Sequence, residues 1–339
     1  AHFLRIGSVQ IDLGHPSAPA PGLYATDVVL HDAHGAVRAT IPAIRLGLRP
    51  VDAMRGILRL SAVSLLRPRL RLPTALGKPA APGNDTAAAL PASAGLASLL
   101  EAATRLLGTV DRVSLRDAVI EIPGGDGSLQ VIENVSLSLR RAGDAIAAEG
   151  TIPLPGGGTM RMSAQREPQG RTAATLALRD MPSAALAPLH PTLAPLREVD
   201  APLGGVLRVG LARDGVVETA RLSGALGPGH LPGITGGAPV PFQAFEITAA
   251  LDPASGQVSL DRLVLRSALG QMTASGTLEP AMEDGQLAGV VLALSLGETI
   301  LPLGLPERGA APALARFDGG SLVARLHRDP ATLELAELF

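Results

Sequence analysis

The feature that most constrains this chain is an alternation of apolar and polar residues with a period of two. In VIENVSLSLR (131–140), one parity carries Val131, Val135, Leu137 and Leu139, and the other parity is mostly polar. A two-residue period predicts a β-strand with one apolar face and one polar face. Roughly eighteen short segments of this kind follow one another between Gly, Pro and Asp clusters, a spacing typical of an extended all-β architecture.

The first strands are expected in 4–14, 23–32, 37–48 and 57–72, with HDAHG (31–35) as a hairpin turn. Segments 113–122 and 129–140 are expected to start an antiparallel meander that continues to residue 180. A bulge is suspected near Arg262, and a bulge reverses the parity of everything that follows it in the strand. The alternation alone therefore does not decide which parity faces inward.

Two segments interrupt the strands. ASAGLASLLEAATRLLGTV (92–110) has helical spacing and predicts an amphipathic helix, after a low-complexity linker at 77–91. Segment 181–203 is interrupted by Pro188, Pro191 and Pro195, which predict two short helical turns with Pro182 near the start of the first.

These patterns give an organisation in five parts. They are an N-terminal β unit at 1–76, a flexible linker plus amphipathic helix at 77–110, a β meander at 111–180, a short helical interruption at 181–203 and a continuing sheet at 204–339. The chain opens and stops inside strand-like patterns, so we interpret it as a segment of a longer protein.

Composition excludes several classes of function. The net charge is −2 and only six residues are aromatic, which argues against a nucleic-acid-binding protein. Without cysteine, disulfides and thiolate metal sites are excluded. We find no catalytic, phosphate-binding or metal-binding motif, so we expect no enzyme activity, no cofactor and no metal. The longest apolar stretch, 288–296, is too short to cross a bilayer.

The apolar faces of the strands must be shielded from water. The expected helix and the Pro-broken pair of turns can shield only part of them. Either the sheet forms an open groove with an apolar floor, or its side chains pack on one another in a sandwich or solenoid. A surface of Val, Leu, Ile and Ala can accept acyl chains by burial of apolar area alone. At about 0.8 kcal/mol per CH₂, a chain of roughly sixteen carbons leaving such a surface for water faces a barrier on the order of 12 kcal/mol.

Several stretches of the chain together resemble one known family of proteins. The opening unit is PGLYATDVVLHDAHGAVRATIPAIRLGLRPVDAMRGILRLSAVSLLRPRLRL (21–72), with a D-V-x-L-x-D-x-x-G hairpin and P-x-I-x-L-x-L-x-P from Pro42 to Pro50. MPSAALAPLHPTLAPLREVDAPLGGVLRVGL (181–211) is similar to the family's helical interruption. LSGALGPGHLPG (222–233) and VSLDRLVLRSALGQMTASGTLEP (258–280) are similar to its later strands. The family is the AsmA-like proteins, and among them the stretches resemble the YhdP-type branch. The resemblance covers most of 3–339.

The resemblance implies a mainly β protein with a long, twisted antiparallel sheet curled into a taco-like apolar groove. It also implies a periplasmic lipid-transfer bridge of the Gram-negative envelope. Such a bridge is anchored in the inner membrane by an N-terminal helix that this chain lacks, and it moves phospholipid toward the outer membrane. Phospholipid acyl chains would then be the ligand, and the helix at 92–110 would lie along or plug the groove. The expected lining residues are Val113, Leu115, Val135, Leu137, Leu139, Leu207, Val209, Leu211, Leu263, Leu265, Leu96, Leu99, Leu100 and Leu107.

Two rival classes remain. A non-catalytic β-rich scaffold or envelope-assembly segment would pack its apolar faces on one another. A polysaccharide-processing β-solenoid enzyme would need clustered carboxylates and sugar-stacking aromatic residues, and the six aromatic residues argue against it.

Overall fold

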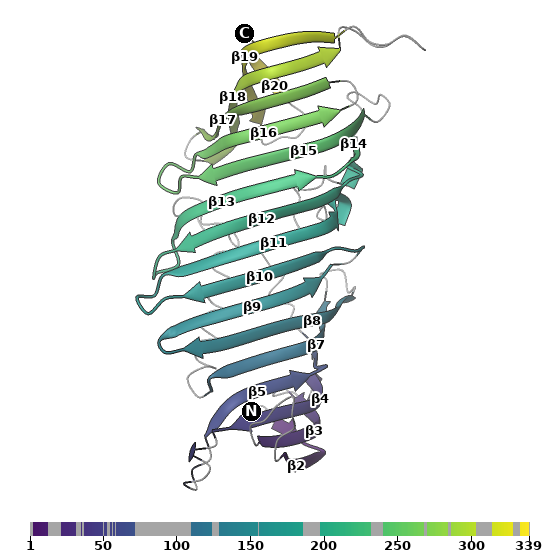
Figure 1. Cartoon of the computed structure of the whole chain (residues 1–339), viewed down its shortest axis with the longest axis vertical. Coiled ribbons are helices and arrows are strands. Elements are labelled where there is room, and N and C mark those ends of the chain that lie inside the picture. The colour runs from purple at the N-terminus through teal and green to yellow at the C-terminus, as the bar shows by residue number, and fades with distance from the viewer. Residues whose placement is uncertain are drawn as a thin grey trace. The chain divides into compact units, whose positions relative to one another are not determined.

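In the part of the chain that the structure describes, the fold is mainly β with almost no helix, as the alternation predicts: strands account for 79% of the described residues of this computed structural model (Figure 1). The structure describes residues 3–12, 22–31, 35, 37–49, 51–52, 55, 57, 59–71, 110–123, 129–154, 156–185, 197–231, 240–267, 270–283, 286–302, 314–327 and 333–338.

The chain divides into two compact units, each of which is described by itself. Unit 1 comprises Ala1–Pro155, Thr159–Ala174 and Leu211–Val216, and unit 2 comprises Gly156–Gly158, Thr175–Gly210 and Val217–Phe339.

Unit 1 is a sheet in which β1 and β2 both pair with β3, and β3 to β10 then follow in chain order. Neighbours are antiparallel except where β5 and β6 pair with β7 in parallel. Figure 1 shows β7 to β10 side by side. The strands are β1 (Phe3–Arg5), β2 (Ser8–Asp12), β3 (Gly22–His31), β4 (Val37–Leu48), β5 (Leu60–Leu66), β6 (Arg69–Arg71), β7 (Arg112–Pro123), β8 (Leu129–Ala142), β9 (Ala145–Pro153) and β10 (Thr159–Arg166).

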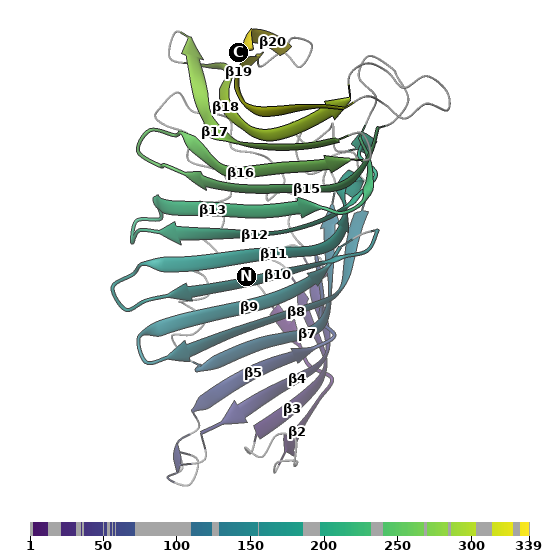
Figure 2. The same cartoon turned by 45° about the horizontal axis from the view of Figure 1, so that its top comes forward.

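Unit 2 contains an antiparallel sheet in which β13 and β14 both pair with β15, and β15 to β20 follow in chain order. In Figure 2 strands β17 and β18 bend along their length. The strands are β11 (Thr172–Pro182), which begins in unit 1, β12 (Pro202–Leu211), which ends there, β13 (Val217–Leu226), β14 (Gly229–Leu231), β15 (Val240–Leu251), β16 (Val258–Ser267), β17 (Gly270–Glu283), β18 (Gln286–Pro302), β19 (Leu314–His327) and β20 (Leu333–Leu338).

The local predictions have mixed outcomes. β3 and β4 pair antiparallel as far as His31 and Val37, which flank the hairpin turn expected at 31–35; residues 32–34 of that turn lie outside the described residues. The single strand expected at 57–72 is wrong, since β5 and β6 are separated at Arg67 and Pro68. Residues 183–185 and 197–198 form 3₁₀ turns within the expected interruption. The linker at 77–91 and the helix at 92–110, apart from Val110, lie outside the described residues.

A line of irregular backbone crosses the sheet of unit 1, and we call it the crease. It consists of Asp27, Pro42, Arg67, Asp117 and Asn134, one after another on β3, β4, the β5–β6 break, β7 and β8. All of these residues except Pro42 have positive φ, between 47° and 57°. Positive φ is uncommon outside glycine, and Asp and Asn tolerate it best. Four such residues in neighbouring strands show that the deviation belongs to the sheet rather than to one strand.

The crease shifts side-chain parity. Leu115 pairs with Leu137 and Ala118 pairs with Val135, so Leu115 and Ala118 share a face although they are three residues apart. The extra residue is a β-bulge. On β8 the bulge at Asn134 likewise removes Val131 from the face of Val135. The expectation that those two valines share a face is therefore wrong, and Val131 is 43% exposed.

Unit 2 contains the suspected bulge near Arg262. The register of β16 shifts between Leu260 and Leu263 against β17, and Asp261 is bypassed in the pairing with β15. Leu260 and Leu263 consequently face the same side and pack in one apolar cluster. This prediction is confirmed.

The crease predicts an unusual substitution pattern at Asn134, whose side chain is exposed. Asn134→Val should lower the free energy of unfolding by about 1–2 kcal/mol, because a β-branched residue is strained at positive φ. Asn134→Gly should be neutral or slightly stabilising. Urea denaturation of both variants measures this, and equal loss of stability in the two would contradict the crease.

Candidate functional site

The most extensive feature of unit 1 is a set of apolar residues that oppose one another directly from strand to strand. We call such a set an apolar row. Two rows, two residues apart on every strand, each cross eight strands. The first contains Val9, Ala25, Ile44, Leu65, Leu115, Leu137, Gly150 and Met162, and the second contains Ile11, Leu23, Leu46, Val63, Val113, Leu139, Ala148 and Ala164.

The rows form clusters of packed side chains. Leu139 and Ile146 are buried together with Val110, and Val63 and Val113 pack against them while remaining half-buried. Across the crease, Val28 is fully buried beside Ala25. Because cross-strand apolar pairs are the stabilising unit of a sheet, the rows hold unit 1 together.

Gly150 leaves room for the side chains of its two neighbours in the first apolar row. A Cβ placed on Gly150 would lie 2.9 Å from Cγ of Met162 and 3.3 Å from Cδ1 of Leu137. The two flanking side chains therefore lean over the glycine, and the apolar surface stays closed where a side chain is missing.

The opposite face of unit 1 is polar. On this face, at the strand positions between those of the two apolar rows, lies a polar row. It contains Gln10, Tyr24, Arg45, Ser64, Ser114, Ser138, Glu149 and Ser163. The Oγ atoms of Ser64 and Ser114 lie 2.9 Å apart in a hydrogen bond, and Arg140 pairs with Glu149 at 3.5 Å. An exposed ion pair of this kind contributes at most about 1 kcal/mol, so Arg140 and Glu149 add little stability, whereas Ser114 is buried within the polar row.

Unit 2 repeats the arrangement across six strands, β13 and β15 to β19. On its polar face, Glu246 lies 3.9 Å from both Arg262 and Arg266, above Val264, which is 1% exposed. The apolar rows are Leu222, Ala249, Leu260, Gly276, Leu294 and Leu322, and beside them Ala220, Leu251, Val258, Leu278, Leu292 and Ala324.

The structure brings most of the predicted lining residues of unit 1 together. Val113 pairs with Leu139 and Leu115 with Leu137, while Val135 lies beyond the bulge opposite Ala118. All of these side chains share the apolar face.

The remaining predicted residues divide into three groups. Leu263 and Leu265 of unit 2 lie on its apolar face, in register with Ile247 and Phe245. On β12, Leu207 and Val209 are half-buried and Leu211 is buried. Leu96, Leu99, Leu100 and Leu107 lie outside the described residues.

Sequence reasoning missed part of both surfaces. Ile44, Leu46, Val63 and Leu65 belong to the rows of unit 1 but were not expected to line the site. Their signal was present in the alternation of PAIRLGL (42–48) and SAVSLL (61–66). The alternation does not show that β5 pairs in parallel with β7. This pairing joins these residues to Val113 and Leu115.

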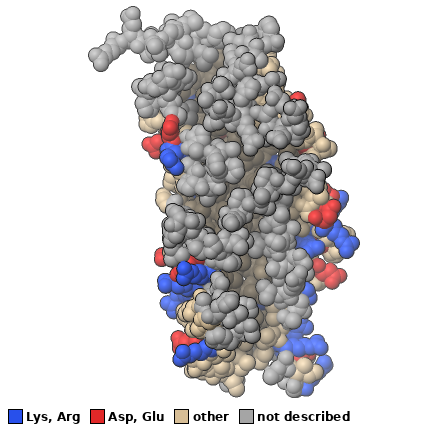
Figure 3. All heavy atoms as spheres, turned by 180° about the vertical axis from the view of Figure 1, so that it is seen from behind, with Lys and Arg blue, Asp and Glu red and all other residues tan. Residues whose placement is uncertain are grey.

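Ionisable groups in the described residues offer little chemistry. No group of three or more His, Asp or Glu in that part of the chain could hold a metal ion. The pKa of Asp252 is lowered because its carboxylate accepts hydrogen bonds from the Ser255 hydroxyl and the Ala254 amide in the β15–β16 turn. Figure 3 shows charges of both signs in small mixed groups among the described atoms of that view. Among the same residues, no helix is both long and apolar enough to span a membrane.

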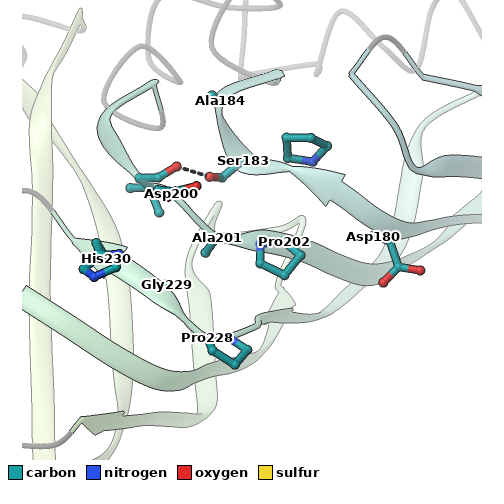
Figure 4. A pocket seen from close by; sticks show the side chains of 11 residues that line it. Asp180, Ser183, Ala184, Asp200, Ala201, Pro202, Pro228, Gly229 and His230 are labelled. Carbon is teal, nitrogen blue, oxygen red and sulfur yellow. Dashed lines mark hydrogen bonds between the residues drawn. The ribbon is translucent and has the colours of Figure 1, made fainter.

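Unit 2 also contains a pocket of about 470 Å³ where β11, β12 and β14 meet. The Ser183 hydroxyl donates a hydrogen bond to the Val199 carbonyl (Figure 4). The backbones of Asp200 and His230 hydrogen-bond to each other. Asp180 and His230 lie at opposite ends of the pocket in this view. The serine is engaged with a backbone carbonyl, so the pocket does not present a nucleophile and base in contact.

Comparisons with known proteins add no relative: no family model, no curated protein and no solved structure matches the chain.

Because the neighbouring side chains pack closely over Gly150, a larger residue at this position should overpack the apolar row. Gly150→Val should lower the free energy of unfolding by about 1–3 kcal/mol, because its side chain would displace Met162 and Leu137. The second substitution Met162→Ala should recover part of that loss in a double-mutant cycle. Gly204→Ala is the control, since its Cβ would meet only the Leu178 carbonyl oxygen at 3.7 Å. Additive effects of the two unit 1 substitutions would contradict the packing described.

Proposed function

We propose that this protein binds phospholipid acyl chains on its apolar rows and acts as a periplasmic segment of an inner-membrane-anchored lipid-transfer bridge. It would move phospholipid toward the outer membrane, as the resemblance to AsmA-like proteins of the YhdP type implies. The function needs no catalytic residue and no cofactor.

The observation that carries the proposal is the unbroken course of the apolar rows. The rows run across the strands, so one apolar surface passes from β2 to β10 without a polar residue in either row. An acyl chain lying along them would exchange one apolar contact for the next as it moves. At about 0.8 kcal/mol per CH₂, release into water at each step would be far more costly.

Partial exposure of the large side chains supports the same function. Leu65 and Leu115 are half-buried although each has an apolar partner on both sides, and Leu137, which lies between Leu115 and Gly150, is half-buried as well. Further apolar area is therefore available to a ligand. Polar groups lie on the opposite face, so the rows favour acyl chains without selecting a head group.

A second candidate, a scaffold with a self-packed core, is favoured by a different observation. Val28 and Ala118 are 0% exposed, and Leu260 is 4% exposed within its cluster. These positions behave as core rather than as a ligand surface. The two functions differ in whether the half-buried leucines between such positions hold lipid.

Substitution of Leu137 separates the two candidates. Leu137→Asp should leave the protein folded but reduce co-purifying phospholipid several-fold, because a carboxylate would interrupt the row. Lipid is measured by native mass spectrometry and by extraction of the purified protein. Thr151→Asp is the matched control: Thr151 lies on the polar face between Ser136 and Arg161, on the strand next to Leu137.

The scaffold predicts another result. A self-packed core would lose several kcal/mol of stability when a charge is buried at residue 137, and the wild-type protein would carry no lipid. Unfolding of Leu137→Asp together with lipid-free wild-type protein would overturn the proposed function.

A further inference from the structure

The apolar face of unit 1 carries two arginines directly beside the second apolar row. The next position on this face is Arg141 on β8, Ile146 on β9 and Arg166 on β10, which stand opposite one another in register. Ile146 is 5% exposed and belongs to the same cluster as Leu139 of the second row, so all three positions share the apolar face. The two arginines therefore flank an apolar residue at the border of the rows.

These arginines keep their charge free of a carboxylate. Within the part of the chain that the structure describes, neither guanidinium forms an ion pair. Asp111 lies beside Arg141, whose amide donates a hydrogen bond to the Asp111 carbonyl. The Asp111 carboxylate, however, is held by Arg49, whose Nη2 lies 2.6 Å from Oδ1 and 2.8 Å from Oδ2. Arg141 and Arg166 thus present positive charge to an anionic group.

We propose that Arg141 and Arg166 bind the phosphate group of a phospholipid whose acyl chains lie on the apolar rows. This inference rests on the proposed function and adds a site for the head group, which the rows themselves do not select. Strands β8 and β10 are two strand spacings, or about 10 Å, apart, so two long side chains can converge on one phosphate above Ile146. Guanidinium groups bind phosphate oxygens through bidentate, charge-assisted hydrogen bonds.

The position of the pair suits a ligand with one charged end and apolar chains. Residues two apart on a strand are separated by about 7 Å, so a phosphate at Arg141 would place the start of an acyl chain beside Leu139. Arg166 is half-buried and Arg141 is exposed. Arginine stems can lie along apolar surface while their charged ends remain outside it. The stems beside Ile146 would therefore extend the acyl-chain surface as far as the phosphate.

Unit 2 has apolar residues at the corresponding place. Beyond Leu278 and Leu292 of its second apolar row, Pro280 stands opposite Val290. The arginine pair is consequently not a general property of strand positions beside the rows. Head-group binding of this kind is expected on unit 1.

The test is isothermal titration calorimetry of the whole chain with three probes. Dioctanoyl phosphatidylglycerol has two acyl chains and a phosphate diester, dioctanoylglycerol has the same chains without phosphate, and inorganic phosphate has no chain. Wild-type protein should bind the phospholipid about tenfold more tightly than dioctanoylglycerol, because charge-assisted hydrogen bonds add to the burial of the chains. With Arg141→Gln and Arg166→Gln combined, the two lipids should bind equally.

Arg161→Gln is the matched control. Arg161 lies on the same strand as Arg166 but on the polar face, opposite Thr151, so this variant should keep the wild-type preference. Circular dichroism shows whether each variant keeps its fold. Arg141→Lys combined with Arg166→Lys retains both charges without the bidentate geometry and should keep part of the preference.

Failure of this inference and failure of the proposed function give different results. Equal affinity of wild-type protein for the two lipids would overturn the arginine site while acyl-chain binding stands, and so would an unchanged preference in the folded double glutamine variant. Absence of binding by either lipid would overturn the proposed function and this inference with it. Inorganic phosphate that binds as tightly as the phospholipid, and no longer binds the double glutamine variant, would assign the pair to a free anion and contradict its role with lipid.

Discussion

Cross-strand register between apolar residues determines which side chains of this sheet can be buried together. A strand has one apolar face only while its parity is kept, and one slipped residue moves every later side chain to the other face. In unit 1 the register aligns Leu65, Leu115 and Leu137 on successive strands. The apolar face is therefore a property of the whole sheet, and the apolar side chains of each strand depend on those of the neighbouring strands for their burial.

The crease shows how this register survives irregular backbone. If β7 alone contained an extra residue at Asp117, its apolar residues would lose their partners beyond that point. The neighbouring strands deviate at the same line, so Ile120 still meets Leu70 on one side and Ile132 on the other. Coordinated bulges change the local twist of a sheet while its apolar face remains continuous.

The sequence predicted the strands and much of the apolar face, because a period of two is directly visible. In β7 it also contained the bulge: Val113 and Leu115 have one parity, Ala118 and Ile120 the other, and Asp117 lies between them. Reading VIENVSLSLR as a single regular strand ignored the equivalent signal at Asn134. The parallel pairing of β5 with β7 was beyond local reasoning, since no periodicity specifies which distant strand lies alongside.

The same limit applies to function. Alternation identifies apolar faces but does not distinguish a ligand surface from a core, and both kinds of position occur on one face here. Ala118 is fully buried, while Leu115 and Leu137 beside it keep exposed area. Half-buried leucines between buried small residues are what an acyl-chain surface needs: a rigid floor with apolar atoms still accessible.

Site-specific photocrosslinking can show whether lipid lies on the apolar rows. A photoreactive amino acid would be placed at residue 137, at residue 263 or, on the polar face, at residue 151. After irradiation of the protein in cells, we expect mass spectrometry to detect phospholipid adducts from residues 137 and 263 and none from residue 151. Adducts from residue 151 in equal amount, or from none of the three, would contradict lipid binding on the rows.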